Sequence, residues 1–365
     1  MYKKLLLYFF IPFAVSIIGI KIYYSKEVEE QKIYHIMDQI KLSFDAQLKN
    51  DKMDDLKVAM LLASNTALID SLDEDDEDRA YATLSHIVKS IKKHTNVSIR
   101  AQIITKDLNI LARSWDDIYA GMPLGDYRDD LQYFKNTKQP RTSLEIGRRL
   151  GIKATVPVYK DGSFLGLVEV ISFFQNTTEF LSSIGVDLYV LLDIKHSDSA
   201  VLMRDNLSIK DYIVSNLTYN YNHIQTLKKI DFKKLSQLQL IHKDKKYIFY
   251  DTMYNGAMEA IGKFVFVLPQ KYIAYFRNPE DDISYLINVT RSSLYKVVKE
   301  QVPQNKLYEQ YKASKLIAFQ NIISPEDKQE FYDVAYQKFD TLTKDELIQM
   351  LLQKKVTKKI NGKIR

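Results

Sequence analysis

The sequence predicts an α+β protein with a long N-terminal helix, two modules built on antiparallel sheets, and a helical C-terminal region. Three observations support this. Apolar residues recur every three or four positions over residues 33–60, which is helical spacing. Two sets of alternating apolar and polar segments, joined by short turns, cover residues 98–173 and 187–268. After Pro279 the apolar spacing becomes helical again.

The composition is that of an ordinary globular chain, with 46% hydrophobic and 27% charged residues over 365 positions, enough for about two domains. The absence of Cys excludes disulfides and thiolate ligands. The net charge of +6 is accounted for by the basic residues of the tail, 354–365, so the rest is near neutral. Nucleic acid is therefore not an expected partner. The tail is either a solvated end or a contact for anionic lipid or an acidic partner.

Residues 5–20 form an unbroken apolar run between Lys4 and Lys21. This run is short for a membrane span, which usually takes about 20 residues, but flanking lysines can extend their charged ends to the interface. No small-residue cleavage site follows the run. We therefore expect an uncleaved transmembrane helix within residues 1–25, with the rest of the chain outside. A cleaved signal peptide and a buried helix are the alternatives.

Residues 26–66 are expected to form a long amphipathic helix leaving the membrane, whose apolar stripe is interrupted at Asn50-Asp51 and continues at Leu56 and Met60. Its apolar stripe serves either as the seam of a homodimer or only as packing for the helix's own sheet. The acidic run over residues 73–78 precedes a helix expected over residues 79–92, where the helix dipole favours acids. This run lacks the Gly that a calcium loop needs, so no metal is expected there.

The first sheet is predicted from two hairpins. Residues 98–105 and 110–114 flank one turn, and residues 153–159 and 164–173 flank the turn Lys160-Asp161-Gly162. Between the hairpins lie the single Trp and a cluster of Arg and Asp. We expect these charged and aromatic groups to face one gap, as in a small-molecule pocket.

The second module is predicted from strands over residues 187–192, 238–241, 247–253 and 260–268, with a helix over residues 209–217. It has no Trp and no comparable Arg–Asp cluster, so we expect the ligand in the first module and a spacer or transmitter role for the second. Helices are expected over four further segments: 283–300, 306–321, 325–339 and 344–354. Ser324 and Pro325 give the third of these helices a good N-terminus.

The candidate ligand site combines both signs of charge. Arg113 and Arg128 suit a carboxylate, and Asp129 or its neighbour Asp130 suits an amine. Trp115 is either a wall of the pocket or a packing anchor. The predicted ligand-binding residues are Arg113, Trp115, Asp117, Arg128, Asp129, Lys153 and Glu169.

Lys153 and Glu169 fall on neighbouring predicted strands, where they either face each other in the pocket or form a surface pair. Arg148 and Arg149 precede a strand and are expected to be exposed. A pocket with both charges suits an amino acid or a small organic acid.

Motifs of catalysis are absent from the sequence. The six His are scattered, and there is no H-E-x-x-H, G-x-S-x-G, Walker A or G-x-G-x-x-G pattern. We therefore expect no cofactor, no metal and no enzyme activity.

Several short runs resemble the first module of double Cache domains, the extracytoplasmic ligand-binding regions of bacterial chemoreceptors and sensor kinases. They are R-S-W at 113–115, G-x-x-L at 121–124, R-D-D-L at 128–131, P-R-T-S-L-E-I-G-R at 140–148, P-V-Y-K-D-G at 157–162 and G-L-V-E at 166–169. The resemblance covers residues 30–180 and weakens toward 275. It implies two PAS-like modules, with ligand contacts on the strands of Lys153 and Glu169. Lys153 stands where the family pattern leads us to expect Arg, which replaces a bidentate contact with a point charge.

The resemblance and the residues together predict the domain plan. It comprises an anchor (1–25), a long helix (26–66), a membrane-distal first Cache module with the pocket (67–180), a second Cache-like module (181–278) and a helical region (279–365). We expect a sensor in the cytoplasmic membrane, its bulk periplasmic, that binds a small metabolite and signals through a separate protein, because kinase, methyl-accepting and cyclase motifs are missing. The alternative is an interaction or assembly protein that uses the same scaffold and its C-terminal helices.

Overall fold

The computed structural model describes residues 2–95, 97–118, 120–125, 128–276, 313, 316–317, 328–340 and 342–348, and the side chains from residue 32 onward. The chain divides into two compact units. One comprises Phe44–Phe232 and Leu240–Tyr275, and contains both sheets. The other comprises Met1–Ser43, Lys233–Gln239 and Phe276–Arg365. The expected helix over 283–300, most of the helix over 306–321 and the basic tail lie outside the described residues.

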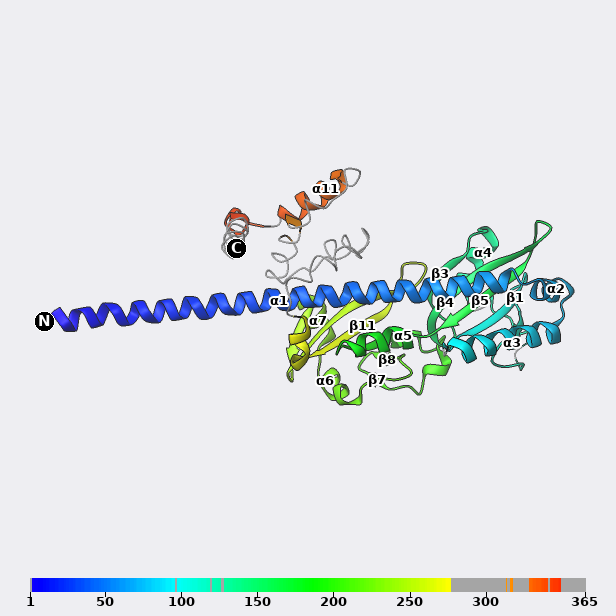
Figure 1. Cartoon of the computed structure of the whole chain (residues 1–365), viewed down its shortest axis with the longest axis horizontal. Helices are drawn as coiled ribbons and strands as arrows, with labels where there is room; N and C mark the ends of the chain where they lie inside the picture. Colours follow the sequence, from blue (N-terminus) through cyan, green and yellow to red (C-terminus); the bar gives the residue numbers. More distant parts are fainter. Residues whose placement is uncertain are drawn as a thin grey trace. The chain divides into compact units, whose positions relative to one another are not determined.

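Helix α1, Tyr2–Ala63, runs without interruption (Figure 1). The interruption of the apolar stripe at Asn50-Asp51 does not break the helix. The Asp51 carboxylate accepts hydrogen bonds from Gln47 Nε2 at 2.9 Å and from Thr177 Oγ1 at 2.6 Å, so it does not compete for the helix backbone.

The membrane anchor expected over residues 1–25 lies outside the residues whose side chains are described. In the described part of the chain, no helix combines the length and the apolar character needed to cross a membrane.

The first sheet has five antiparallel strands in the spatial order β2-β1-β5-β4-β3. Along the chain these strands are β1 Arg100–Thr105, β2 Ile110–Arg113, β3 Arg141–Ile146, β4 Leu150–Lys160 and β5 Ser163–Ser172. The turn at Lys160-Asp161-Gly162 is as expected, since Asp161 and Gly162 both have positive φ, of 50° and 82°, as a tight hairpin turn requires.

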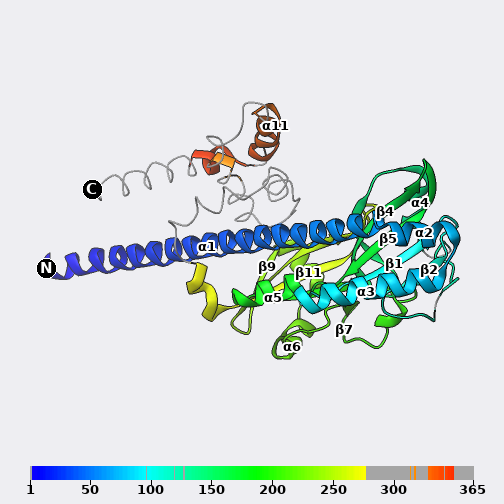
Figure 2. The same cartoon turned by 45° about the vertical axis from the view of Figure 1, so that its right-hand side comes forward.

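One face of the first sheet packs on two helices: α2, Thr66–Glu74, contacts β4 and β5, and α3, Glu77–Thr95, contacts β1 and β2 (Figures 1 and 2). Alternate strand residues such as Ile103, Val156 and Val168 enter this core. The opposite face carries the intervening residues, most of them polar. A short 3-10 helix η1, Asp129–Leu131, and α4, Gln132–Asn136, lie on the chain segment between β2 and β3.

The second sheet has six antiparallel strands in the order β7-β8-β6-β11-β10-β9. They are β6 Asp187–Asp193, β7 Ser208–Ile209, β8 Tyr212–Val214, β9 Leu240–Lys243, β10 Lys246–Tyr254 and β11 Ala260–Pro269. The helix expected over residues 209–217 is wrong. Ile209 pairs with Tyr212 across a two-residue turn, in which Lys210 has a positive φ of 54°.

The remaining helices are short. They are α5 Gln175–Ser183, α6 Ile224–Lys228, α7 Phe232–Leu238, α11 Lys328–Phe339 and the 3-10 helices η2 Ile194–His196, η3 Val201–Met203, η4 Tyr221–His223 and η5 Gln270–Phe276. Helix α11 covers most of the helix expected over residues 325–339. Residues 344–348 are also helical, as expected.

Candidate ligand-binding site

Two rows of side chains cross the face of the first sheet opposite α2 and α3. In one row, Lys153 of β4 lies opposite Ile171 of β5, which lies opposite Arg100 of β1. We call Lys153, Ile171 and Arg100 the cation row. The second row, called the polar row, consists of Thr155, Glu169, Gln102 and Arg113. Because Glu169 and Ile171 are two residues apart on one strand, both rows lie on the same face.

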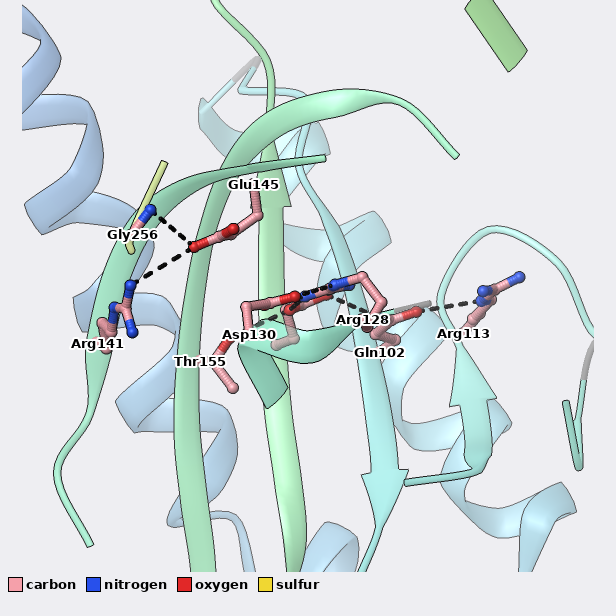
Figure 3. Close-up of polar contacts among 9 residues, drawn as sticks. Gln102, Arg113, Arg128, Asp130, Arg141, Glu145, Thr155 and Gly256 are labelled. Carbon is pink, nitrogen blue, oxygen red and sulfur yellow. Dashed lines mark hydrogen bonds and ion pairs between the residues drawn. The ribbon is translucent and has the colours of Figure 1, made fainter. Parts of the chain in front are cut away.

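Glu169 is the centre of the polar row and is fully buried. Its carboxylate accepts hydrogen bonds from Gln102 Nε2 at 2.7 Å, Thr155 Oγ1 at 3.1 Å and Arg128 Nη2 at 2.6 Å. Gln102 in turn accepts one from Arg113 Nε at 3.1 Å (Figure 3). Every side chain of the row is therefore held in place by its neighbours.

Arg128 is paired with two carboxylates in this network, and because one guanidinium balances only one of them, the charge of Lys153 also acts on both. Arg128 also binds Asp130 through Nε and Nη2, each at 2.7 Å, and its side chain is 3% exposed. Although burial acts to raise the pKa values of Glu169 and Asp130, the guanidinium of Arg128 outweighs it and lowers both. Burial acts to lower the pKa of Arg128, but Glu169 and Asp130 raise it well above its usual range. This guanidinium is committed to the protein's own acids.

Lys153 is the buried cation of the site, with 3% exposure. Its ammonium makes no hydrogen bond or ion pair with any residue that the structure describes. Burial lowers the pKa of Lys153 to about 8, and the nearby charge of Arg128 acts in the same direction, whereas the carboxylates of Glu169, Asp130 and Glu145 act to raise it. A buried cation without a direct counter-ion is a ready partner for an anion.

A cavity of about 80 Å³ opens above the cation row. Its walls combine basic and apolar side chains with one amide and one Gly: Arg100, Gln102, Arg113, Trp115, Leu124, Arg128, Gly147, Arg148, Arg149, Lys153, Ile171, Phe173 and Leu202. No described carboxylate lines it. Burial lowers the pKa of Arg100, and so does the like charge of Arg149, so these two guanidinium groups repel each other.

Trp115 forms an aromatic wall of the cavity. The guanidinium carbons of Arg100 and Arg113 lie 5.3 Å and 5.2 Å from its ring, and Arg100 is also 5.5 Å from the ring of Phe173. These are cation–π contacts. A ligand that attracts Arg100 would change the surroundings of Trp115.

The structure places the seven predicted site residues in three settings. Arg113, Trp115, Arg128 and Lys153 line the cavity, and Glu169 lies beneath it in the polar row. Asp117 and Asp129 are exposed and do not line it. Asp129 begins η1 and is turned to solvent, whereas Asp130, one residue later, is turned inward to Arg128. The expected acidic partner for a ligand amine is therefore missing from the described wall.

Sequence reasoning missed nine of the cavity residues: Arg100, Gln102, Leu124, Gly147, Arg148, Arg149, Ile171, Phe173 and Leu202. The expectation that Arg148 and Arg149 are exposed is wrong, because the second module covers the hairpin that carries them and both are half-buried. Arg100 begins β1 and Phe173 directly follows β5, and only the pairing of these two strands brings them to the site. No signal in the sequence linked Leu202, from the second module, to this site.

Two antiparallel-sheet modules, with a cavity in the first, define a double sensory domain. Residues 32–273 match the family model described as the double sensory domain of two-component sensor kinase. The match spans more than half of the chain, so the chain belongs to this double Cache family. A comparison with curated proteins finds no match.

Several solved structures are similar to part of this chain. The sensor domain of the V. cholerae histidine kinase DctB is 14% identical, with a TM-score of 0.39 over 65% of this chain and 96% of that one. A domain of a sensory box/GGDEF family protein from Vibrio parahaemolyticus is 10% identical, with a TM-score of 0.43 over 68% and 99%. The ligand-binding domain of the Campylobacter jejuni chemoreceptor Tlp3, in complex with 4-methylisoleucine, is 12% identical, with a TM-score of 0.40 over 67% and 90%.

Proposed function

We propose that this chain is a sensor that binds a small organic acid in the cavity of its first module. The observation that carries the proposal is the buried ammonium of Lys153, which lines the cavity without a direct acidic partner among the described residues. Burying an ion without a partner is costly, so such a group is retained where a ligand supplies the opposite charge.

The ligand we propose carries two acidic groups. Lys153 and Arg100 lie two strands apart in the cation row, so their backbones are about 10 Å from each other. Ile171 lies between them, with Trp115 and Phe173 nearby. One carboxylate on Lys153, a second on Arg100 and Arg149, and a short carbon chain over Ile171 would match this pattern.

An amino acid fits this cavity less well than an organic acid. Recognition of a ligand amine requires a carboxylate or several carbonyl groups in the wall. Among the described residues no acid lines the cavity; Glu169 and Asp130 are paired with Arg128, and Asp116 acts on Arg100 from outside the cavity wall. We therefore favour the organic acid over the amino acid as the ligand.

We also propose that the sensor is anchored in the cytoplasmic membrane, with its modules outside. The apolar run over residues 5–20 with its flanking lysines supports the anchor. The family is defined on sensor kinases, and these 365 residues carry no kinase motif, so the signal would pass to a kinase domain outside them. Crosslinking in the native membrane, followed by identification of the attached signalling protein, tests this part.

Calorimetric titration of the detergent-solubilised full chain tests the ligand. The panel is a series of straight-chain diacids of increasing length, from oxalate and malonate through succinate and glutarate to adipate. Acetate, butyrate and alanine are the single-carboxylate controls. We expect one chain length to bind best, at least tenfold better than any control. Lys153→Met should abolish this binding, and Lys106→Met, at an exposed turn of the same sheet, should preserve it. Equal binding of monoacids and diacids would contradict the two-acid proposal, and no binding at all would contradict the sensor proposal.

A further inference from the structure

The second module makes hydrogen bonds to one element of the first, the β3–β4 hairpin. Leu202 N, in η3, donates a hydrogen bond to Arg148 O at 3.0 Å. Leu150 N donates to Met203 Sδ at 3.3 Å, and both of these residues are almost fully buried. The hairpin is thus held at its turn and at the start of β4.

A third contact lies further along the same hairpin. Gly256 N, in the turn between β10 and β11, donates to Glu145 Oε1 of β3 at 3.1 Å, with Arg141 Nη2 3.7 Å from the same oxygen (Figure 3). A Cβ on Gly256 would lie 1.6 Å from Arg141 Nη2, so the two modules approach closely here. Elements of the second module that are far apart in sequence therefore converge on one hairpin.

The same hairpin also supplies the most cationic wall of the cavity. Gly147, Arg148, Arg149 and Lys153 all belong to it and all line the cavity. The turn lies directly against the ammonium, since a Cβ on Gly147 would be 2.8 Å from Lys153 Nζ. If the hairpin moves toward a bound anion, η3 should therefore move with it, because Leu202 of η3 is hydrogen-bonded to Arg148.

Leu202 is the part of the second module that reaches the cavity itself. It lines the cavity although it is an apolar residue that remains 44% exposed. Its backbone is fixed to Arg148, so the exposed side chain is held at the cavity rather than on a free loop. Apolar surface held open at the edge of a ligand site is covered when the ligand binds.

We propose that the second module senses occupancy of the first-module cavity through Leu202, which contacts the ligand and follows the movement of the β3–β4 hairpin. The second module then responds to the ligand rather than acting as a spacer. Replacing Leu202 lowers the affinity for the ligand and separates the conformation of η3 from ligand binding. This inference rests on the proposed function, since it requires a ligand in the cavity.

The test uses the full chain and the diacid of the series that binds best. Hydrogen exchange is followed at the amides of Leu202 and Leu150, with and without saturating diacid, in the wild type, in Leu202→Ala and in Val201→Ala. Val201 is the matched control, because it is an apolar neighbour that is 37% exposed and does not line the cavity.

We expect the diacid to slow exchange at both amides at least fivefold in the wild type. Leu202→Ala should lower the affinity for the diacid at least fivefold and reduce this protection. Val201→Ala should change the affinity less than twofold. Diacid binding with unchanged exchange and an unaffected Leu202→Ala variant would overturn this inference and leave the proposed function standing. Absence of diacid binding in the wild type would instead overturn the proposed function and, with it, this inference.

Discussion

Lys153 of β4 and Arg100 of β1 lie in one row of the sheet, on either side of Ile171 of β5. No described carboxylate lines the cavity above them. The polar row directly below is, in contrast, fully hydrogen-bonded around Glu169. The first sheet therefore carries a hydrogen-bonded charged network in one row and, in the next, two cations that no described carboxylate contacts directly.

Replacing the outer cations should separate diacids from monoacids. In Arg100→Gln and in Arg149→Gln, we expect affinity for the best diacid to fall about tenfold, which is the loss of one charged hydrogen bond at a partly exposed site. Binding of monoacids should change little, since Lys153 holds the first carboxylate. Calorimetric titration of each variant measures both values. An equal loss for monoacids and diacids would place both acidic groups elsewhere.

Ligand affinity should fall as the pH rises through about 8. The pKa of Lys153 is lowered to about 8, mainly by burial, so above that pH the free protein carries a neutral amine there. Binding of an anion then requires uptake of a proton, and affinity declines by up to about tenfold per pH unit. Titrations at pH 7, 8 and 9 measure this decline.

Lys153→Arg is the control for this pH effect, because Arg stays charged over the whole range. Its affinity, whatever its value at pH 7, should be flat between pH 7 and 9. A wild-type affinity that does not change over the same range would show that the charge of Lys153 does not contribute to binding.

Removal of the Glu169 carboxylate should destabilise the first module. Glu169→Gln leaves the buried Arg128 with Asp130 alone, and breaking a buried pair costs about 3–5 kcal/mol in the free energy of unfolding. Urea unfolding measures it, with Glu179→Gln on exposed α5 as control. If Glu169→Gln lowers the free energy of unfolding by less than 1 kcal/mol, the network does not stabilise the sheet.

Asp55 on α1 should make stability fall as the pH rises. Ser172 Oγ donates to its carboxylate, and burial, with smaller contributions from Asp51 and Asp54, raises its pKa from 3.8 to about 7. Because the folded state holds the proton more tightly, the stabilisation is complete below about pH 4 and is lost between pH 4 and 7.

Asp55→Asn should remove this dependence. At pH 8 we expect the variant to be about 4 kcal/mol more stable than the wild type in urea unfolding, and near pH 4 about equally stable. Asp205→Asn, at an exposed position, should follow the wild type at both values. A variant that is less stable than the wild type at pH 8 would show that the folded protein needs this negative charge.

Much of the sheet architecture could be predicted from local patterns. Strands β4 and β5 alternate in polarity on either side of a turn whose residues adopt positive φ. Strand β3 was missed because its polar sequence is only half-buried over its first three residues. The helix predicted over residues 209–217 arose because Ile209, Ile213 and Leu217 recur at a spacing of four. The turn at Lys210 decides the structure instead.

The site could be predicted only where the residues lie close in sequence. Arg113 and Trp115 adjoin each other, and the resemblance to double Cache domains placed Lys153 and Glu169. The row that joins Lys153 to Arg100 depends on β1 pairing with β5, two strands more than 50 residues apart in sequence. Such a pairing requires the sheet order, which the local pattern does not contain. The contribution of Leu202 depends in addition on contacts between the two modules.

The most direct test of the central claim is the fluorescence of Trp115, the sole Trp of the chain, during titration with the diacid series. The ring of Trp115 contacts Arg100 and Arg113 in the cavity wall, so its emission reports on this cavity. We predict a saturable change that is greatest at one diacid length, is absent in Lys153→Met and is retained in Lys106→Met. Saturable diacid binding with unchanged Trp115 emission, or an equal response in Lys153→Met, would contradict the assignment of the ligand to this cavity.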